Sequence, residues 1–244
     1  MTPRFRVGTS GWVYPHWRGV FYPDGLPQTR WFEFYARTFS TVEINNTFYR
    51  LPGEAAWRRW RQAAPPGFVY AVKGSRYITH VKRLAAGAAS LDLFTGRARI
   101  LEDRLGPILW QLHPEHRRDP ERLRTFLEQL PRDLRHVFEF RHPSWFCDDI
   151  YALLRDAGAG LCAYHMVDHA TPLVATADFA YMRFHGSGDL YGGRYGDDEL
   201  AGWVERLAAL PVSDVFVYFN NDAFGHAVDN ALTFRALAAS GARR

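Results

Sequence analysis

Residues that can transfer protons recur at the ends of short apolar runs in this sequence. Glu43 and Glu139 are carboxylates in such positions, and His185 titrates near neutral pH. Lys73 could act as an imine-forming nucleophile if desolvation lowered its pKa. We therefore predict Glu43, Lys73, Glu139 and His185 as catalytic candidates for acid/base chemistry.

A second set of polar residues at the same strand ends suits substrate binding. Arginine binds carboxylate and phosphate groups through two parallel hydrogen bonds, and Gly186–Gly188 forms a glycine-containing turn of the kind that holds phosphate in barrels. The predicted binding residues are Ser10, Trp12, Asn45, Gln111, His113, Arg141, Arg183, Gly186, Ser187 and Asn220. Because the cations outnumber the carboxylates, we expect a small anionic ligand such as phosphate or a phosphorylated metabolite.

The alternation of side chains along a strand indicates which of these residues share a face. Glu139 and Arg141 lie opposite Phe138 and Phe140, which suit the layer between sheet and helices, so the charged pair is expected to point inward. The same parity groups Arg183 with His185, Glu43 with Asn45 and Thr47, Lys73 with Ala71, and Gln111 with His113. A structural reading stays open, in which these charges form a buried ion-pair network that fills the interior.

Cofactor motifs are absent from the sequence. It contains no Gly-x-Gly-x-x-Gly, P-loop, Gly-x-Ser-x-Gly or His-Glu-x-x-His pattern. Glu43, His113, Glu139 and His185 could converge on a metal, but the neighbouring cations would oppose it. We predict no cofactor, and a metal is possible but not favoured.

Strand-like and helix-like segments alternate along the whole chain. The expected strands are Phe5–Thr9, Thr41–Asn45, Phe68–Lys73, Ile108–Leu112, Val137–Arg141, Gly160–His165, Ala180–His185 and Val215–Asn220. The expected helices are Gln28–Thr38, Glu54–Ala63, Leu91–Leu105, Pro120–Leu130 (after Asp119 as N-cap), Asp148–Asp156, Asp197–Leu210 and His226–Ala239. Pro172 makes the sixth connection an incomplete helix. This alternation predicts an α/β fold, a single (β/α)₈ TIM-type barrel over residues 1–244, with the site at the carboxyl ends of the strands.

Composition limits the class of protein. Hydrophobic residues make up 47% and charged residues 23%, as in soluble globular domains. Two cysteines, Cys147 and Cys162, are too few for a disulfide framework, and no apolar run is long enough for a membrane helix, so we expect a cytoplasmic protein without a membrane partner. The net charge of +4 permits nucleic acid as a partner without requiring it.

Several segments together resemble the YecE-like family, catalogued as domain of unknown function 72. They are Val7–Trp12, Phe21–Pro23, Val42–Tyr49, Lys73–Arg76 with Ile78–His80, Glu139–Trp145, Arg183–Gly186 and Tyr218–Asp222, and they follow one another from the first strand to the last helix. The resemblance implies a single TIM-type barrel. Because the family has no settled reaction, it implies no catalytic role for any residue.

Three functional hypotheses follow. The first is an enzyme that acts on a small anionic substrate by proton transfer or hydrolysis, as a hydrolase, isomerase or lyase. The second is a protein that binds or processes nucleic acid, suggested by the basic charge and the aromatic residues of the loops. The third is a barrel that binds a small molecule without catalysis.

Overall fold

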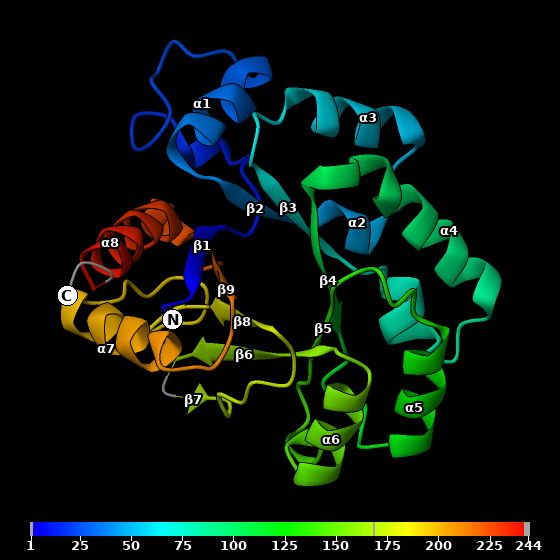
Figure 1. The fold of residues 1–244 in the computed structure, drawn as a ribbon. Helices are drawn as coiled ribbons and strands as arrows, with labels where there is room; N and C mark the ends of the chain where they lie inside the picture. The colour runs from blue at the N-terminus through cyan, green and yellow to red at the C-terminus, as the bar shows by residue number, and fades with distance from the viewer. Residues whose placement is uncertain (1, 168, 242–244) are drawn as a thin grey trace. The chain divides into compact units, whose positions relative to one another are not determined.

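The computed structural model of the chain describes residues 2–167 and 169–241, and parallel strands alternate with helices through them (Figure 1). The fold is α/β and of the TIM-barrel class, as predicted from the alternation. The chain divides into two compact units: unit 1 comprises the described residues within Met1–Glu43 and Ala163–Arg244, and unit 2 comprises Ile44–Cys162. The expectation of a single domain over residues 1–244 stays a prediction.

Unit 1 is built around three parallel strands in the order β1 (Arg4–Thr9), β9 (Asp214–Phe219) and β8 (Phe179–Phe184). The end of β6 (Gly160–Met166) lies beside β8, because the His185 amide donates to the carbonyl oxygen of His165 at 2.8 Å. The remaining elements are η1 (Pro15–Trp17), η2 (Gln28–Arg30), α1 (Trp31–Thr38), the start of β2 (Thr41–Ile44), β7 (His169–Ala170), α7 (Asp197–Ala208), η6 (Ala223–Gly225) and α8 (His226–Gly241).

Unit 2 holds β3 (Val69–Lys73), β4 (Leu105–Gln111) and β5 (His136–Glu139) as neighbouring parallel strands, followed by the first residues of β6. Its helical elements are α2 (Asn46–Tyr49), α3 (Glu54–Ala63), the π-helical η3 (Tyr77–Val81), α4 (Ala88–Ala98), η4 (Arg99–Arg104), α5 (Pro120–Gln129), η5 (Pro143–Trp145) and α6 (Asp148–Asp156).

Most predicted elements are confirmed with small shifts of their ends. The Asp119 cap is confirmed, since its Oδ1 accepts from the Arg122 amide at 3.1 Å. The sixth connection contains no helix in Val167 or in residues 169–178, in agreement with the weak pattern there. The helix expected over Leu91–Leu105 is wrong: α4 starts at Ala88, Glu102 takes a positive φ of 48° in η4, and Leu105 already begins β4.

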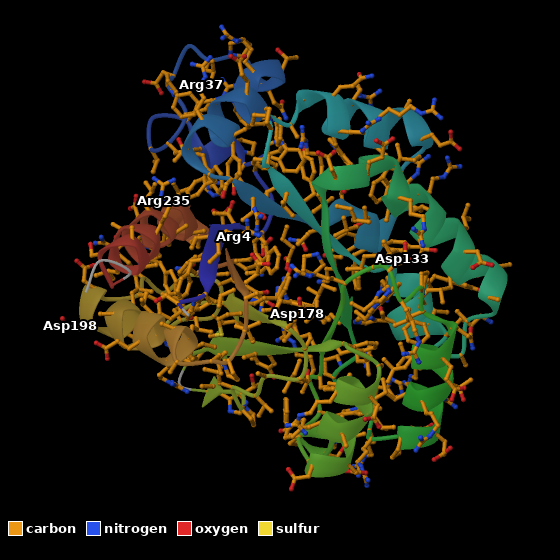
Figure 2. All side chains as sticks on the ribbon, viewed as in Figure 1. Arg4, Arg37, Asp133, Asp178, Asp198 and Arg235 are labelled. Carbon is orange, nitrogen blue, oxygen red and sulfur yellow. The ribbon has the colours of Figure 1, made fainter. Side chains whose placement is uncertain are left out.

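The interiors of both units are rich in aromatic side chains, and the helices carry exposed charged side chains on their outer faces. In unit 2 the fully buried Trp110 ring packs against Phe94 and Phe126 at centroid distances of 5.5 and 5.3 Å. Charged residues such as Arg37 on α1 and Asp198 on α7 are exposed (Figure 2). Among the described residues, no helix combines the length and apolarity needed to cross a membrane.

His136 is expected to make the protein sensitive to acid. Its Nδ1 accepts from Trp110 Nε1 at 3.2 Å and its Nε2 lies 3.0 Å from the Pro131 carbonyl oxygen, so the buried ring is satisfied as a neutral imidazole. Burial lowers the pKa of His136 from 6.5 to about 4. The unfolded chain therefore binds a proton at a higher pH than the folded chain. The stability that His136 contributes is present above pH 6.5 and is lost as the pH falls through 4.

The measurement is the free energy of unfolding between pH 7 and 4 for the wild type and His136→Gln. The difference between the two profiles should change by about 3 kcal/mol over this range, the equivalent of the pKa shift. Comparing the two proteins cancels other groups that titrate in this range, such as His80 and His116. Parallel profiles would show that His136 is not the acid-sensitive group.

Candidate functional site

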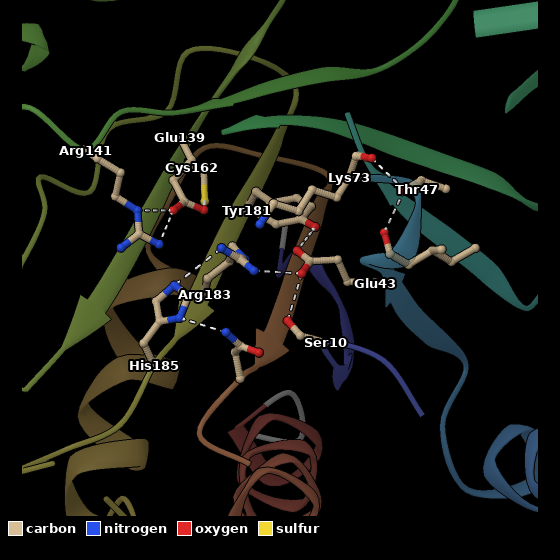
Figure 3. Close-up of polar contacts among 12 residues, drawn as sticks. Ser10, Glu43, Thr47, Lys73, Glu139, Arg141, Cys162, Tyr181, Arg183 and His185 are labelled. Carbon is tan, nitrogen blue, oxygen red and sulfur yellow. Dashed lines mark hydrogen bonds and ion pairs between the residues drawn. The ribbon is translucent and has the colours of Figure 1, made fainter. Parts of the chain in front are cut away.

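The buried carboxylate of Glu43, on β2, is the centre of a polar cluster in unit 1 (Figure 3). Oε1 accepts from Ser10 Oγ at 2.8 Å and from Arg183 Nη2 at 2.9 Å, and Oε2 accepts from the Tyr181 hydroxyl at 2.7 Å. Glu43 is fully buried and Arg183 is 2% exposed. Since three donors hold both carboxylate oxygens, the carboxylate is well suited to fix the position of the guanidinium.

Arg183 continues the cluster to His185 and Asn220. Its Nη1 lies 3.4 Å from His185 Nε2, and a guanidinium can only donate, so this contact requires Nε2 without a proton. A neutral imidazole then carries its proton on Nδ1, which lies 3.1 Å from Nδ2 of Asn220. Because an amide nitrogen only donates, this contact becomes a hydrogen bond from His185 when the Asn220 amide is turned so that its oxygen faces Nδ1. The predicted pairing of Arg183 with His185 on one face is confirmed.

Tyr181 is a member of this cluster that the sequence analysis missed. Burial and the charge of Glu43 raise the pKa of Tyr181 well above its usual value, so its hydroxyl stays protonated and donates. The signal was available, because Tyr181 and Arg183 have the same parity along β8.

In the loop after β8, Gly186 and Ser187 form hydrogen bonds with other residues of unit 1. The Gly186 amide donates to the Tyr195 hydroxyl at 3.1 Å, and Ser187 Oγ donates to Glu199 at 3.0 Å. Gly186 has a φ of 119°, and a Cβ at this position would lie 2.1 Å from the Asp189 carbonyl oxygen. The loop also brings the Tyr191 ring edge-on to His185, with centroids 5.6 Å apart. Gly186 and Ser187 thus shape a closed turn beside His185.

Trp12 lies in the loop that follows β1 in unit 1. The Trp12 ring packs edge-on against Phe32, with 5.3 Å between the centroids, and the Trp12 carbonyl oxygen accepts from the Tyr22 hydroxyl at 2.6 Å. Trp12 therefore takes part in the aromatic packing of this loop.

His16 and Asp222, which are not among the predicted site residues, form an ion pair with 2.9 Å between Nε2 of the histidine and Oδ2 of the aspartate. Burial raises the pKa of Asp222 to about 6.

Glu139 and Arg141 form a separate cluster in unit 2. Glu139 is fully buried, Arg141 is 10% exposed, and Nε and Nη2 of the arginine both contact Glu139 Oε1. Cys162 Sγ donates to Oε2 at 3.8 Å. The predicted common face of Glu139 and Arg141 is confirmed, and each of the two buried glutamates carries its own arginine.

Lys73 lies over an aromatic ring in unit 2. Its Nζ is 4.4 Å from the centroid of Phe48, whose ring contacts His80 at 4.9 Å. His80 in turn contacts the ring of His113 at 5.3 Å. Burial, followed by the nearby His113 and Lys73, lowers the pKa of His80 to about 4. His80 does not stand at a strand end, and it joins this group because the π-helical turn of η3 places it there.

Gln111 and Asn45 are the remaining predicted binding residues in unit 2. Gln111 is the last residue of β4 and is in register with Glu139. The expected alternation of Glu43, Asn45 and Thr47 is wrong, because β2 ends at Ile44 and α2 begins at Asn46. Thr47 Oγ1 instead donates to the carbonyl oxygen of Lys73 at 2.6 Å. Within the described ranges, no three His, Cys, Asp or Glu side chains are grouped so that they could hold a metal ion.

Comparisons with known proteins give matches over nearly the whole chain. The family described as "Protein of unknown function DUF72" matches residues 6–244. A DUF72 family protein of Thermotoga maritima has a crystal structure that superposes with a TM-score of 0.85, at 29% identity over 96% of this chain and 98% of that one. A DUF72 family protein of Enterococcus faecalis gives 0.80 at 19% identity, with 96% and 95% covered, which supports the fold. The UPF0759 protein YunF of Bacillus subtilis is 23% identical, with 92% of this chain and 91% of that protein covered.

Proposed function

Because the chain belongs to the DUF72 family, which is described as of unknown function, we propose its function from the geometry of the Glu43 cluster: an enzyme that performs acid/base chemistry on a small anionic substrate. The observation that carries this proposal is the chain of contacts from Glu43 through Arg183 to His185. It runs along the carboxyl ends of strands in a TIM-type fold, where the active sites of such enzymes lie.

The cost of burying these groups supports a functional role. Removing a carboxylate and a guanidinium from water costs several kcal/mol per ion, and well-packed apolar residues are often as stable or more stable in their place. Here the pair is followed by a histidine that is 1% exposed and joined to the Asn220 amide. Such a row of oriented polar groups suits a site in which charge or protons move.

We assign each residue of the cluster a role. Arg183, whose Nη2 donates to Glu43, binds the anionic group of the substrate. His185 transfers the proton, with its ring oriented by Asn220. Glu43 and Tyr181 are positioning residues, since the carboxylate already accepts from three side chains.

The test is turnover of a panel of phosphorylated sugars and small carboxylates in D₂O, followed by NMR. Proton transfer at carbon appears as deuterium incorporation, and hydrolysis appears as released inorganic phosphate. His185→Asn is expected to lower kcat by about 10²- to 10⁴-fold, the usual contribution of general acid/base catalysis. Arg183→Leu is expected to raise KM for the anionic substrate.

His169→Asn is the matched control, because His169 is an exposed histidine of the same unit on β7. It should leave turnover unchanged. A wild-type protein that converts no member of the panel, or a His185→Asn variant as active as the wild type, would overturn the proposal.

A further inference from the structure

A second histidine–carboxylate pair lies in the loops of unit 1, close along the chain to two residues of the Glu43 cluster. His16 belongs to η1 and follows Ser10 by six residues, and Asp222 follows Asn220 by two. Both loops leave the carboxyl ends of adjacent parallel strands, β1 and β9, since Thr9 is in register with Phe219. The Tyr14 hydroxyl donates to the Ser10 carbonyl, and the Tyr14 ring lies 5.6 Å from the ring of His16.

The contacts of His16 define which of its nitrogens carries the proton. Nε2 lies 2.9 Å from Asp222 Oδ2 and 2.9 Å from the Asp222 carbonyl oxygen. Both partners are acceptors, so Nε2 is protonated and donates. In a neutral imidazole Nδ1 is then a bare acceptor, and among the described residues it has no hydrogen bond. The His16 side chain is 46% exposed, so Nδ1 is open to a ligand.

Asp222 is held more firmly than its partner. Its side chain is 13% exposed, and Oδ1 accepts from Nε1 of the fully buried Trp17 at 2.6 Å. A buried carboxylate that binds one ring nitrogen, with the other nitrogen open, is the arrangement that orients a histidine as a general base and balances its charge once it is protonated.

We propose that His16 is a second catalytic residue of unit 1 and that Asp222 positions it. This proposal rests on the proposed function of the Glu43 cluster. Nδ1 of His16 takes a proton from the O–H or C–H bond of the bound substrate. A new N–H bond forms, and the electron pair of the broken bond stays on the substrate atom. Asp222 neutralises the imidazolium ion, and the proton returns to product or to water.

A structural tie between the two loops is the competing explanation, and His16→Gln separates the two. The Gln side-chain nitrogen can still donate to Asp222, so the tie is kept while the basic nitrogen is lost. We expect kcat to fall by about 10²- to 10⁴-fold with KM and Tm unchanged. His16→Ala should regain activity when imidazole is added, because the half-exposed position admits it. Asp222→Asn should lower kcat, and Asp222→Glu should restore part of it.

The test combines the kinetic assays of the His16 and Asp222 variants with ¹⁵N NMR of the histidine rings. The NMR measurement reports the His16 tautomer without any substrate. The proposal expects the proton on Nε2 in the wild type. A proton on Nδ1, or a His16→Gln variant with wild-type kcat while His185→Asn is inactive, would overturn this proposal and leave the function of the Glu43 cluster standing. A wild-type protein that turns over no member of the panel would overturn both.

Discussion

Glu43→Ala is expected to lower the free energy of unfolding by about 3–5 kcal/mol, the range measured when one partner of a buried ion pair is removed. The change takes away the carboxylate that balances the guanidinium of Arg183, which is 2% exposed. It also removes the acceptor for the hydroxyls of Ser10 and Tyr181. Urea unfolding followed by circular dichroism measures the loss.

The double variant Glu43→Ala with Arg183→Met separates the charge from the packing. Because the methionine carries no charge, the double variant should cost less than the sum of the two single variants. Glu33→Ala is the matched control: Glu33 is a glutamate of the same unit that also pairs with arginines, Arg30 and Arg37, but its side chain is 51% exposed and theirs are 56% and 67% exposed, so the charges that remain can be hydrated. Its cost should be less than half that of Glu43→Ala. If the losses of the two single variants simply add up to the loss of the double variant, Glu43 and Arg183 are not energetically coupled.

The second large effect is expected at Gly8, in the interior of β1. A Cβ on this residue would lie 2.2 Å from the Thr41 carbonyl oxygen and 3.0 Å from the Tyr35 hydroxyl. Neither can move easily, because Thr41 is in β2 and the Tyr35 hydroxyl contacts the Thr9 amide and the Thr41 oxygen, both at 3.0 Å. Gly8→Ala should therefore cost about 3 kcal/mol or more, the upper end for overpacking.

Gly25→Ala is the control for this prediction. Gly25 belongs to the same unit, has an ordinary φ, and has nothing within 4 Å of an added Cβ. Its substitution should change the free energy of unfolding by less than about 0.5 kcal/mol. Chemical denaturation of both variants decides the matter, and equal stabilities would show that β1 and β2 can separate enough to admit a methyl group.

The charged residues show how much of the site can be predicted from the sequence. Strand parity correctly placed Arg183 with His185 and Glu139 with Arg141, because alternation depends only on neighbours along one strand. It failed at Asn45 and Thr47, where the chain turns into α2 directly after Ile44. It also could not show which carboxylate each arginine takes, since Glu43 and Arg183 are 140 residues apart.

The helix expected over Leu91–Leu105 illustrates the same limit for the fold. Its apolar spacing is typical of a continuous helix, but the chain tightens into η4 and turns at Glu102 so that β4 can begin at Leu105 and pair with β3. Periodicity describes the face that a segment buries, and the point at which the segment must stop is set by the strand that follows.

The sequence by itself determined the α/β class, the order of strands and helices, and the polar residues at the strand ends. These follow from local patterns of side-chain size, polarity and turn residues. Only the tertiary structure decided that Glu43 holds Ser10, Tyr181 and Arg183 together, and that His16 meets Asp222. Such pairings depend on how segments far apart in the chain pack, because a buried charge takes the partner that the packing brings within hydrogen-bond distance.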